Sequence, residues 1–343
     1  MIDWLKILET LGYILIFPGF LFCFLVGLFL SGVDRKIVAK MQKRVGPPLL
    51  QPFYDFFKLC GKETIVPAVA NKGMFLAAPL VGLASLIVLQ MFIPVFSFTA
   101  FSTMADVIVI LYLLLIPALA MILGGAASGS PYAGVGLSRE MVTVIACELP
   151  LVLVLLAVAR VVGDATNAEH GLVFSMTEIT GYQMAHGSLI TKISMIPAAI
   201  AFLLIIPGET GSHPFDTAEA ETEICEGLLA EYSGAPLAVF KLSHSIKVLT
   251  LSSLFVALFL GGLGGKLTAL VGAMGLAGAA AGMVGGLLGA ILLVLLCVVI
   301  TIVFISLVHA ITARLKIEQV FKYYWTVVTG LALISLVLAW YGF

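Results

Sequence analysis

Long apolar stretches separated by short polar segments dominate the pattern of this chain. Eight stretches are long enough to cross about 30 Å of hydrocarbon at about 1.5 Å per residue. They lie near residues 11–33, 74–96, 104–127, 140–162, 191–207, 236–262, 280–306 and 324–342, and the fifth is the shortest. Because unpaired backbone groups are not tolerated in lipid, the pattern predicts an all-α, polytopic membrane bundle of about eight transmembrane helices. We expect residues 1–343 to form a single integral membrane domain.

Composition supports a lipid-embedded chain. Hydrophobic residues make up 61% of the sequence, charged residues 11%, and the mean hydropathy is +1.16, whereas a soluble domain carries about 25% charged residues. The N-terminal MIDWLKILET holds two acids and one base, and no A-x-A site follows the first apolar run. We therefore interpret that run as the first permanent helix rather than a signal peptide.

Basic residues predict the orientation of the spans. If the spans alternate, 14 of the 18 Lys and Arg lie on the face that carries segments 34–73, 128–139, 208–235 and 307–323. Basic loops favour the cytoplasmic side of a membrane. We expect these four segments to be cytoplasmic loops of a multi-pass protein of the cell membrane, with both termini outside.

Two segments outside this scheme have a pattern of their own. In residues 49–63, Phe53, Phe56, Phe57 and Cys60 recur at helical spacing, which predicts a short amphipathic helix at the membrane interface. Residues 261–289 contain eleven glycines, and Gly278, Gly282 and Gly286 are four apart. That spacing favours close helix packing in lipid.

Motifs for metal or nucleotide chemistry are missing from the sequence. The five cysteines form no CxxC pair, so we expect no metal or iron–sulfur cluster held by this chain, and no disulfide framework. There is no P-loop, no GxGxxG after a strand and no basic, aromatic-interleaved surface, and no nucleic-acid partner is expected.

The segment 208–234 concentrates acids in an otherwise apolar chain. It holds seven of the 19 Asp and Glu and no Lys or Arg. We expect a helix after Thr217 as N-cap, with Asp216, Glu219, Glu223 and Glu226 along one face. Such like charges repel, and partial burial raises carboxyl pKa values, so the row could exchange protons near neutral pH. The alternative is a solvated helix whose acids meet water and nearby bases.

Ionisable residues also fall inside apolar spans. A charge at the bilayer centre costs about 2.5–3.5 kcal/mol even on the mild insertion scale, so such residues are functional candidates. The set comprises Asp106, Glu140, Glu148, Lys241, His244 and Lys247. Lys241, His244 and Lys247 recur every three residues near one face of the sixth span. A lone histidine there is usually a hydrogen-bonded packing residue, and the two lysines beside it make a functional role equally reasonable.

Three motifs together resemble subunit 1 of the membrane arm of respiratory complex I and its relatives. They are DRKIVAKMQKRVGPPLLQPFYDFFKLCGKE at 34–63, PFDTAEAETEICEGLLAEYSG at 214–234 and TARLKIEQVFKYYW at 312–325. The resemblance covers most of the chain, and the order of the motifs matches. It implies a non-catalytic subunit that docks the peripheral electron-transfer arm and couples redox chemistry to ion movement.

The resemblance also assigns residues. Glu148, Asp216, Glu219, Glu221, Glu223 and Glu231 match the family's acids, and Arg35 and Lys36 match its ERK opening, in which Asp34 replaces Glu. With the charges found above, the expected proton or ion path is Glu140, Glu148, Asp216, Glu219, Glu221, Glu223, Glu226, Glu231, Lys241, His244 and Lys247. The expected partner-docking residues are Arg35, Lys36, Arg44, Asp55, Lys58, Lys62, Glu63, Arg314 and Lys316.

Departures from the quinone-reducing members favour one branch of the family. The chain runs from RVGP straight to PLLQP, about six residues shorter, Glu226 replaces a small residue, and His244 stands where Glu is usual. The short loop resembles the membrane anchor of group 4 energy-converting nickel–iron hydrogenases. That implies hydrogenase large and small subunits, with a nickel–iron centre and iron–sulfur clusters, and antiporter-like membrane subunits as partners. The alternatives are the same role in a quinone or methanophenazine oxidoreductase, a passive anchor, and, more weakly, a stand-alone transporter, for which no internal repeat is found.

Overall fold

The computed structural model describes residues 4–96, 105–166, 171–273 and 279–342. Apart from an isolated bridge between Asp106 and Ser175, these residues form helices and their connections. The helices are α1 Trp4–Leu15, α2 Phe20–Met41, α3 Gln51–Cys60, α4 Lys72–Phe92, α5 Val107–Ser128, α6 Pro131–Ala165, α7 Met176–His186, α8 Met195–Thr210, α9 Glu221–Ile224, α10 Gly234–Phe259, α11 Gly262–Ala273, α12 Ala279–Ile300, α13 Leu307–Ile311, α14 Ile317–Tyr323 and α15 Thr329–Trp340. Two π-helical turns, Thr301–Ser306 and Tyr324–Val328, continue α12 into α13 and α14 into α15.

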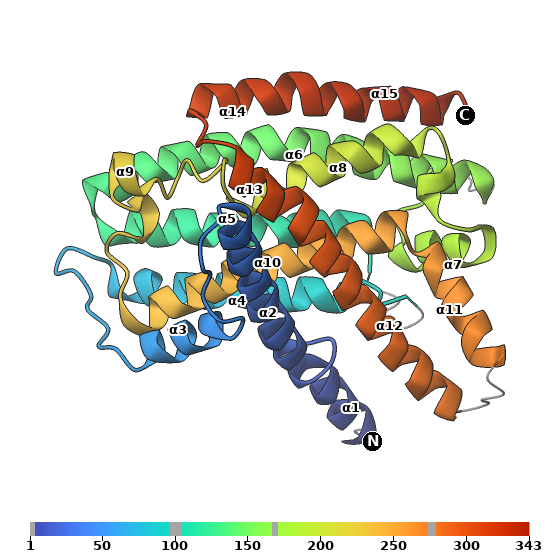
Figure 1. The fold of residues 1–343 in the computed structure, drawn as a ribbon, viewed down its shortest axis with the longest axis horizontal. Helices are drawn as coiled ribbons and strands as arrows, with labels where there is room; N and C mark the ends of the chain where they lie inside the picture. Colours follow the sequence, from blue (N-terminus) through green and yellow to red (C-terminus); the bar gives the residue numbers. More distant parts are fainter. Residues whose placement is uncertain (1–3, 97–104, 167–170, 274–278, 343) are drawn as a thin grey trace.

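The predicted membrane bundle is confirmed. Among the described residues, seven helical segments are long and apolar enough to span a membrane, and α8 is a shorter apolar helix of 16 residues. Together they correspond to the eight predicted spans. In Figure 1 α6, α8 and α15 lie side by side, while α2 and the α12–α13 segment cross the bundle obliquely.

Helices continue into several of the predicted loop segments. Residues 131–139 belong to α6, because Pro131 begins the helix nine residues before the predicted span. Residues 34–41 extend α2, and the 307–323 segment contains α13 and α14. A helix can continue beyond the hydrocarbon wherever its polar side chains find partners, so apolarity alone locates spans better than helix ends.

Helix α10 occupies the centre of the bundle. In its most apolar window 94% of residues are buried, compared with 33–50% for the other spans, and it contacts α2, α3, α4, α8 and α12. Protein rather than lipid therefore surrounds the middle of α10, and this placement permits the buried Lys247 on a membrane-length helix.

The short segments lie at the two ends of the bundle. Helices α3 and α9 lie at one end in Figure 1, and α7 and α11 at the other. Helix α3 confirms the predicted amphipathic helix, and the ring of Phe24 on α2 lies 5.2 Å from that of Phe56 and 5.9 Å from that of Phe53. We call the α3–α9 end the loop face.

Glycine packing occurs at other positions than predicted. A Cβ on Gly262 would lie 2.3 Å from the Ser188 nitrogen, and one on Gly265 would lie 2.5 Å from the Met184 oxygen, so these two glycines bring α11 against the end of α7. Gly286 has open space around it. Gly278 lies outside the described residues, as does the side-chain environment of Gly282.

Candidate functional site

The acidic segment does not form the predicted helix. Helix α8 ends at Thr210, Gly211 follows in the left-handed conformation, and the chain runs as a loop to α9, which is four residues long. Cys225 and Glu226 then adopt positive φ angles of 51° and 65°. Asp216, Glu219, Glu223 and Glu226 therefore do not line one helix face. Like charges repel on such a face, and in the loop two of these acids meet bases from other elements instead.

Arginines from two neighbouring elements hold this loop. Arg139 of α6 donates to Glu223 at 2.6 Å and to the Thr217 carbonyl at 3.3 Å. Arg314, between α13 and α14, donates through Nε to Asp216 at 2.9 Å. Although burial would raise the pKa of Asp216, hydrogen bonds and charge from His213 and Arg314 lower it to about 2. Asp216 is therefore a fixed anion that anchors the loop.

The far end of the segment is fixed by a buried tyrosine. The Tyr232 hydroxyl donates to the Phe75 carbonyl on α4 at 3.1 Å, and the two rings stack at 4.0 Å. Burial raises the Tyr232 pKa. Glu226 and Glu231, predicted as path residues, are exposed on the loop face.

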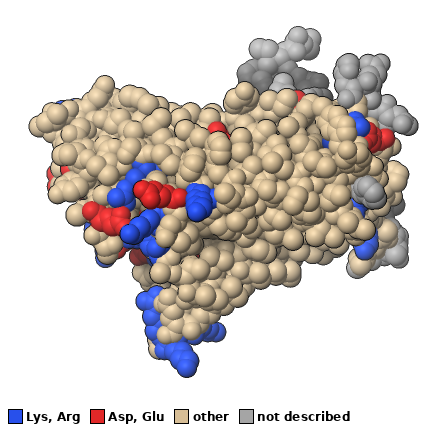
Figure 2. Space-filling model, turned by 90° about the horizontal axis from the view of Figure 1, so that it is seen from above, with Lys and Arg blue, Asp and Glu red and all other residues tan. Residues whose placement is uncertain are grey.

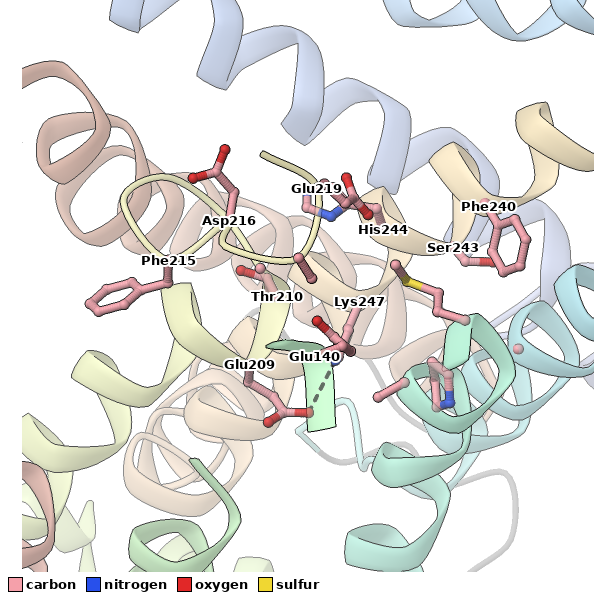
Figure 3. A pocket seen from close by; sticks show the side chains of 16 residues that line it. Glu140, Glu209, Thr210, Phe215, Asp216, Glu219, Phe240, Ser243, His244 and Lys247 are labelled. Carbon is pink, nitrogen blue, oxygen red and sulfur yellow. Dashed lines mark ion pairs between the residues drawn. The ribbon is translucent and has the colours of Figure 1, made fainter. Parts of the chain in front are cut away.

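An ion pair lies beneath the loop, inside the bundle. Lys247 Nζ of α10 is 3.0 Å from Glu209 Oε1 at the end of α8, and the side chains are only 9% and 4% exposed (Figure 3). The second Glu209 oxygen is buried and meets no hydrogen-bond donor among the described residues. Glu209 was absent from the predicted path, because it ends an apolar span and precedes the PFD motif that drew attention to the other acids.

A cavity brings this pair together with the loop acids. Figure 3 places Glu140 of α6 next to Lys247, with Glu219 and His244 on the loop side of the pair. The polar residues lining this cavity are Glu140, Glu209, Thr210, Asp216, Glu219, Ser243, His244 and Lys247. Five predicted path residues from distant parts of the sequence (Glu140, Asp216, Glu219, His244 and Lys247) thus share one cavity.

His244 and Glu219 connect this cavity to its neighbours. Glu219 borders three cavities and His244 borders four. Burial, together with the nearby charges of Glu140, Asp216 and Glu226, raises the pKa of Glu219 to about 7, against the opposing effect of Lys241. Glu219 can therefore take up or release a proton near neutral pH.

The remaining path residues lie around this core. Glu148 is partly buried on α6, two helical turns from Glu140, and interacts electrostatically with Glu209 and Lys247. Lys241 borders the cavity between α2, α3 and α10, while Glu221 borders the outer cavity near α13. Asp106, noted in the sequence, caps α5 by accepting from the Ile108 amide at 3.1 Å.

The predicted docking residues divide into two groups. Arg35 and Arg314 pair within the chain, Arg35 with Asp55 of α3 at 2.8 Å. Burial alone would raise the pKa of Asp55, but the hydrogen bonds from Gln51 and Arg35 outweigh this effect, so the pKa is lowered. Lys36 is partly buried, and besides Arg35 the exposed members are Arg44, Lys58, Lys62, Glu63 and Lys316. Figure 2 shows how Lys, Arg, Asp and Glu gather in groups on an otherwise uncharged surface.

Among the described residues, no group of His, Cys, Asp or Glu could hold a metal ion. The five cysteines are free, and Cys60 and Cys225 are exposed. What the site offers chemically is a chain of carboxyl, imidazole and ammonium groups suited to binding and passing protons.

Comparison with known proteins identifies the family. The NADH dehydrogenase family matches residues 14–340. Hydrogenase-4 component C of Escherichia coli (strain K12) is 37% identical over 73% of this chain and 76% of that protein. A subunit of the NADH-quinone oxidoreductase of Bordetella petrii is 31% identical over 76% of this chain and 78% of its own length. Among solved structures, a chain of the membrane-bound sulfane sulfur reductase, an archaeal respiratory membrane complex, superposes with a TM-score of 0.81 at 27% identity, covering 97% of this chain and 99% of its own. The chain therefore belongs to the NADH dehydrogenase family and is a membrane subunit of a complex I-like complex.

Proposed function

We propose that this chain is the membrane subunit of an energy-converting hydrogenase-type complex, where it docks the peripheral electron-transfer arm and couples redox chemistry to H⁺ or Na⁺ translocation. The observation that carries the proposal is the buried Glu209–Lys247 pair, which shares a cavity with Glu140 and Glu219. A buried ion pair contributes little net stability, so retaining one in a membrane bundle points to a role in ion movement.

Protons would enter this path from the loop face. Glu219 changes charge near pH 7, and its proton affinity responds to the neighbouring acids. A redox change in a partner docked on the loop face would alter the electric field there. A proton would then pass between Glu219, Glu140 and the Glu209–Lys247 pair, and the pair would transmit the change to Glu148.

Glu148 would pass the signal on along the membrane. It lies on α6, partly buried, two turns deeper than Glu140. The α6 surface around it carries the exposed apolar side chains of Ile145 and Leu149. Antiporter-like membrane subunits are the expected recipients on this side.

Two observations favour a hydrogenase-type complex. The hydrogenase-4 relative is 37% identical and the NADH-quinone oxidoreductase relative 31%. The shortened RVGP–PLLQP segment and His244 also depart from the quinone-reducing pattern. A nickel–iron centre and iron–sulfur clusters would then reside in the hydrogenase large and small subunits. The loop face would be cytoplasmic, and both termini would lie outside the cell membrane.

The cavity between α2, α3 and α10 favours a second candidate, the equivalent subunit of a quinone-reducing complex. Arg35, Phe56 and Phe240 line this cavity, and such a mixture of apolar side chains with a few polar ones is typical of small-molecule sites. A quinone head recovered with the assembled complex would support this candidate. A passive anchor would need neither this cavity nor the buried pair.

Subunit composition is the first test. The complex would be isolated in mild detergent through a tag on this chain, with subunits identified by mass spectrometry and metals by elemental analysis. Nickel with excess iron is expected for the hydrogenase-type assembly, whereas iron without nickel would favour the quinone or sulfur branch. Recovery of this chain alone, stable and monodisperse, would overturn the subunit role.

Coupling is the second test. Glu140→Gln and Glu209→Gln complexes would be reconstituted into vesicles, with Glu231→Gln as the control because Glu231 is exposed on the loop face. In the complexes that assemble, both variants are expected to lose ion translocation at least about tenfold. Wild-type coupling in both would leave a passive anchor, whose assembly should instead weaken with salt.

A further inference from the structure

Two histidines that take no part in the proposed path form a pair near the loop face. The imidazole of His213, in the loop after α8, stacks on that of His309 in α13 with ring centres 4.6 Å apart and planes inclined by 22°. His213 Nε2 lies 3.2 Å from an Asp216 carboxylate oxygen, and the side chain of His213 is 40% exposed. The pair is therefore within reach of solvent and held by an anion.

An acid from α2 completes the cluster. Asp34 accepts a hydrogen bond of 2.6 Å from the Ser306 hydroxyl, in the π-helical turn that precedes α13. Asp34 also interacts electrostatically with His309 and His213. Asp34, Ser306 and His309 thus join α2 to the end of the seventh span.

A cavity runs from this cluster to the proposed path. It is lined by Asp34, Gly211, Ser212, His213, Asp216, Glu219, Glu221, Thr222, His244, Ile305, His309 and Arg314. Glu221 and Thr222 are exposed at its rim, whereas Glu219 and His244 also border the inner cavity of the Glu209–Lys247 pair. A smaller cavity joins Asp34 and Ser212 to His244 on the inner side.

This route differs from the cavity beside α3. The α3 cavity is lined by Arg35, Asp55 and Phe56, and none of the cluster residues Asp34, His213 and His309 borders it. The two cavities meet only at Glu219 and His244. The cavity beside His213 and His309 therefore gives access from the loop face to His244 without crossing the α3 cavity.

We propose that His213 and His309 form a proton-loading inlet that supplies His244 and Glu219 from the solvent on the loop face. The inference rests on the proposed ion-coupling function. An imidazole can accept one proton on a ring nitrogen and release another from the second nitrogen, and an unperturbed imidazole changes charge between about pH 5 and 8. Two imidazoles in contact disfavour the doubly charged state, so the pair takes up one proton at a time. That proton passes through water in the cavity to His244 or Glu219, and no electron transfer is involved.

Charged groups of both signs face the pair from the elements around it. They are Asp34, Arg35 and Arg44 of α2 and the loop after it, Asp216, Glu219 and Glu221 of the loop and α9, His244 of α10, and Arg314 beyond α13. The carboxylates of Asp34 and Asp216 favour the protonated pair, and the arginines favour its release.

The test compares histidine variants in the reconstituted complex. His213→Gln and His309→Gln are expected to lower ion translocation per turnover by about tenfold at pH 8, with a smaller loss at pH 6, where protons in bulk water are more abundant. His186→Gln is the matched control, because His186 lies at the end of α7 and contacts the Tyr182 backbone. Losses equal at both pH values, or no loss in either variant, would overturn the inlet.

Chemical rescue separates proton transfer from structure. His309→Ala leaves space beside His213, and imidazole added on the loop-face side should restore translocation at pH 8 without changing the control. If that variant does not assemble, His213→Ala serves the same measurement. A loss that imidazole does not restore would assign the pair a structural role. If the histidine variants behave like wild type but Glu140→Gln still loses coupling, only the inlet proposal is overturned. If Glu140→Gln couples like wild type, both the inlet and the proposed function are overturned.

Discussion

The ion pairs of the loop face and the ion pair inside the bundle are built from the same kinds of side chain in opposite surroundings. Arg35–Asp55 joins side chains that are 46% and 40% exposed, and Arg139–Glu223 joins side chains that are 24% and 48% exposed. Glu209–Lys247 is almost completely buried. Exposed pairs are screened by water and salt and contribute about 0–1 kcal/mol.

This difference in burial suits the two kinds of ion pair to different roles. The Arg139–Glu223 pair and the less exposed Arg314–Asp216 pair hold the loop between α8 and α10 in the place where Asp216 and Glu219 reach the cavity. The buried pair cannot lose one partner without leaving an uncompensated charge. A proton gained or lost there therefore changes the energy of the bundle far more than the same event on the loop face.

Removing one partner of the buried pair should have the largest effect. Lys247→Met leaves the Glu209 carboxylate unpaired, and we expect a loss of about 3–5 kcal/mol in unfolding free energy. The Lys247→Met/Glu209→Gln double variant should recover most of that stability but not ion translocation. Thermal unfolding of the detergent-solubilised complex would measure the first effect, with Lys58→Met on exposed α3 as control. A single variant as stable as wild type would contradict the assigned burial.

Glu219→Gln should change how stability depends on pH. Because the folded-state pKa of Glu219 is raised from 4.5 to about 7, the wild type loses stability as pH rises through that interval. The variant lacks this loss, so its stability relative to wild type should improve between pH 4 and pH 8 by roughly 3 kcal/mol. Unfolding midpoints across this range provide the measurement. Parallel curves for the two proteins would exclude a near-neutral Glu219.

Asp216→Asn should show the opposite sign of pH dependence. Its folded-state pKa is lowered from 3.8 to about 2, so its stabilising effect is present above pH 4 and lost as pH falls through 2. The variant should be less stable than wild type at neutral pH by roughly 2 kcal/mol, and the gap should close in acid. Limited proteolysis of the 211–220 loop gives a second readout. An unchanged loop would mean that Arg314 and His213 do not hold it.

The smallest effect is expected at the most exposed pair. Arg35→Gln should change unfolding free energy by about 0–1 kcal/mol, and less at high salt. If Arg35 also contacts the peripheral arm, partner binding should weaken in low salt and converge with wild type in high salt. Pull-down yield over a salt series would measure this. A stability loss as large as that of Lys247→Met would erase the distinction between the two regions.

The sequence alone determined the membrane bundle, the family and most of the charged residues of the site. Apolar stretches long enough to cross lipid are a local property, and so is the amphipathic spacing of α3. Motifs such as PFDTAEAETE persist in linear order, which is why the family could be recognised. Charge is costly in an apolar span, which marks Glu140, His244 and Lys247 as functional candidates. Glu219 is marked by its place in the acidic segment 208–234.

Only the tertiary structure decided which charges meet. Glu209 and Lys247 are separated by a loop and by several turns of α10, and no periodicity links them, so their pairing depends on how α8 packs against α10. The acidic segment forms a loop instead of the expected helix, and in this loop Glu223 and Asp216 pair with arginines that are far away in sequence, Arg139 and Arg314. The stacking of His213 on His309 likewise depends on α13 lying over the loop after α8. Contacts between distant segments follow from packing and the pairing of charges, and local sequence patterns do not encode them.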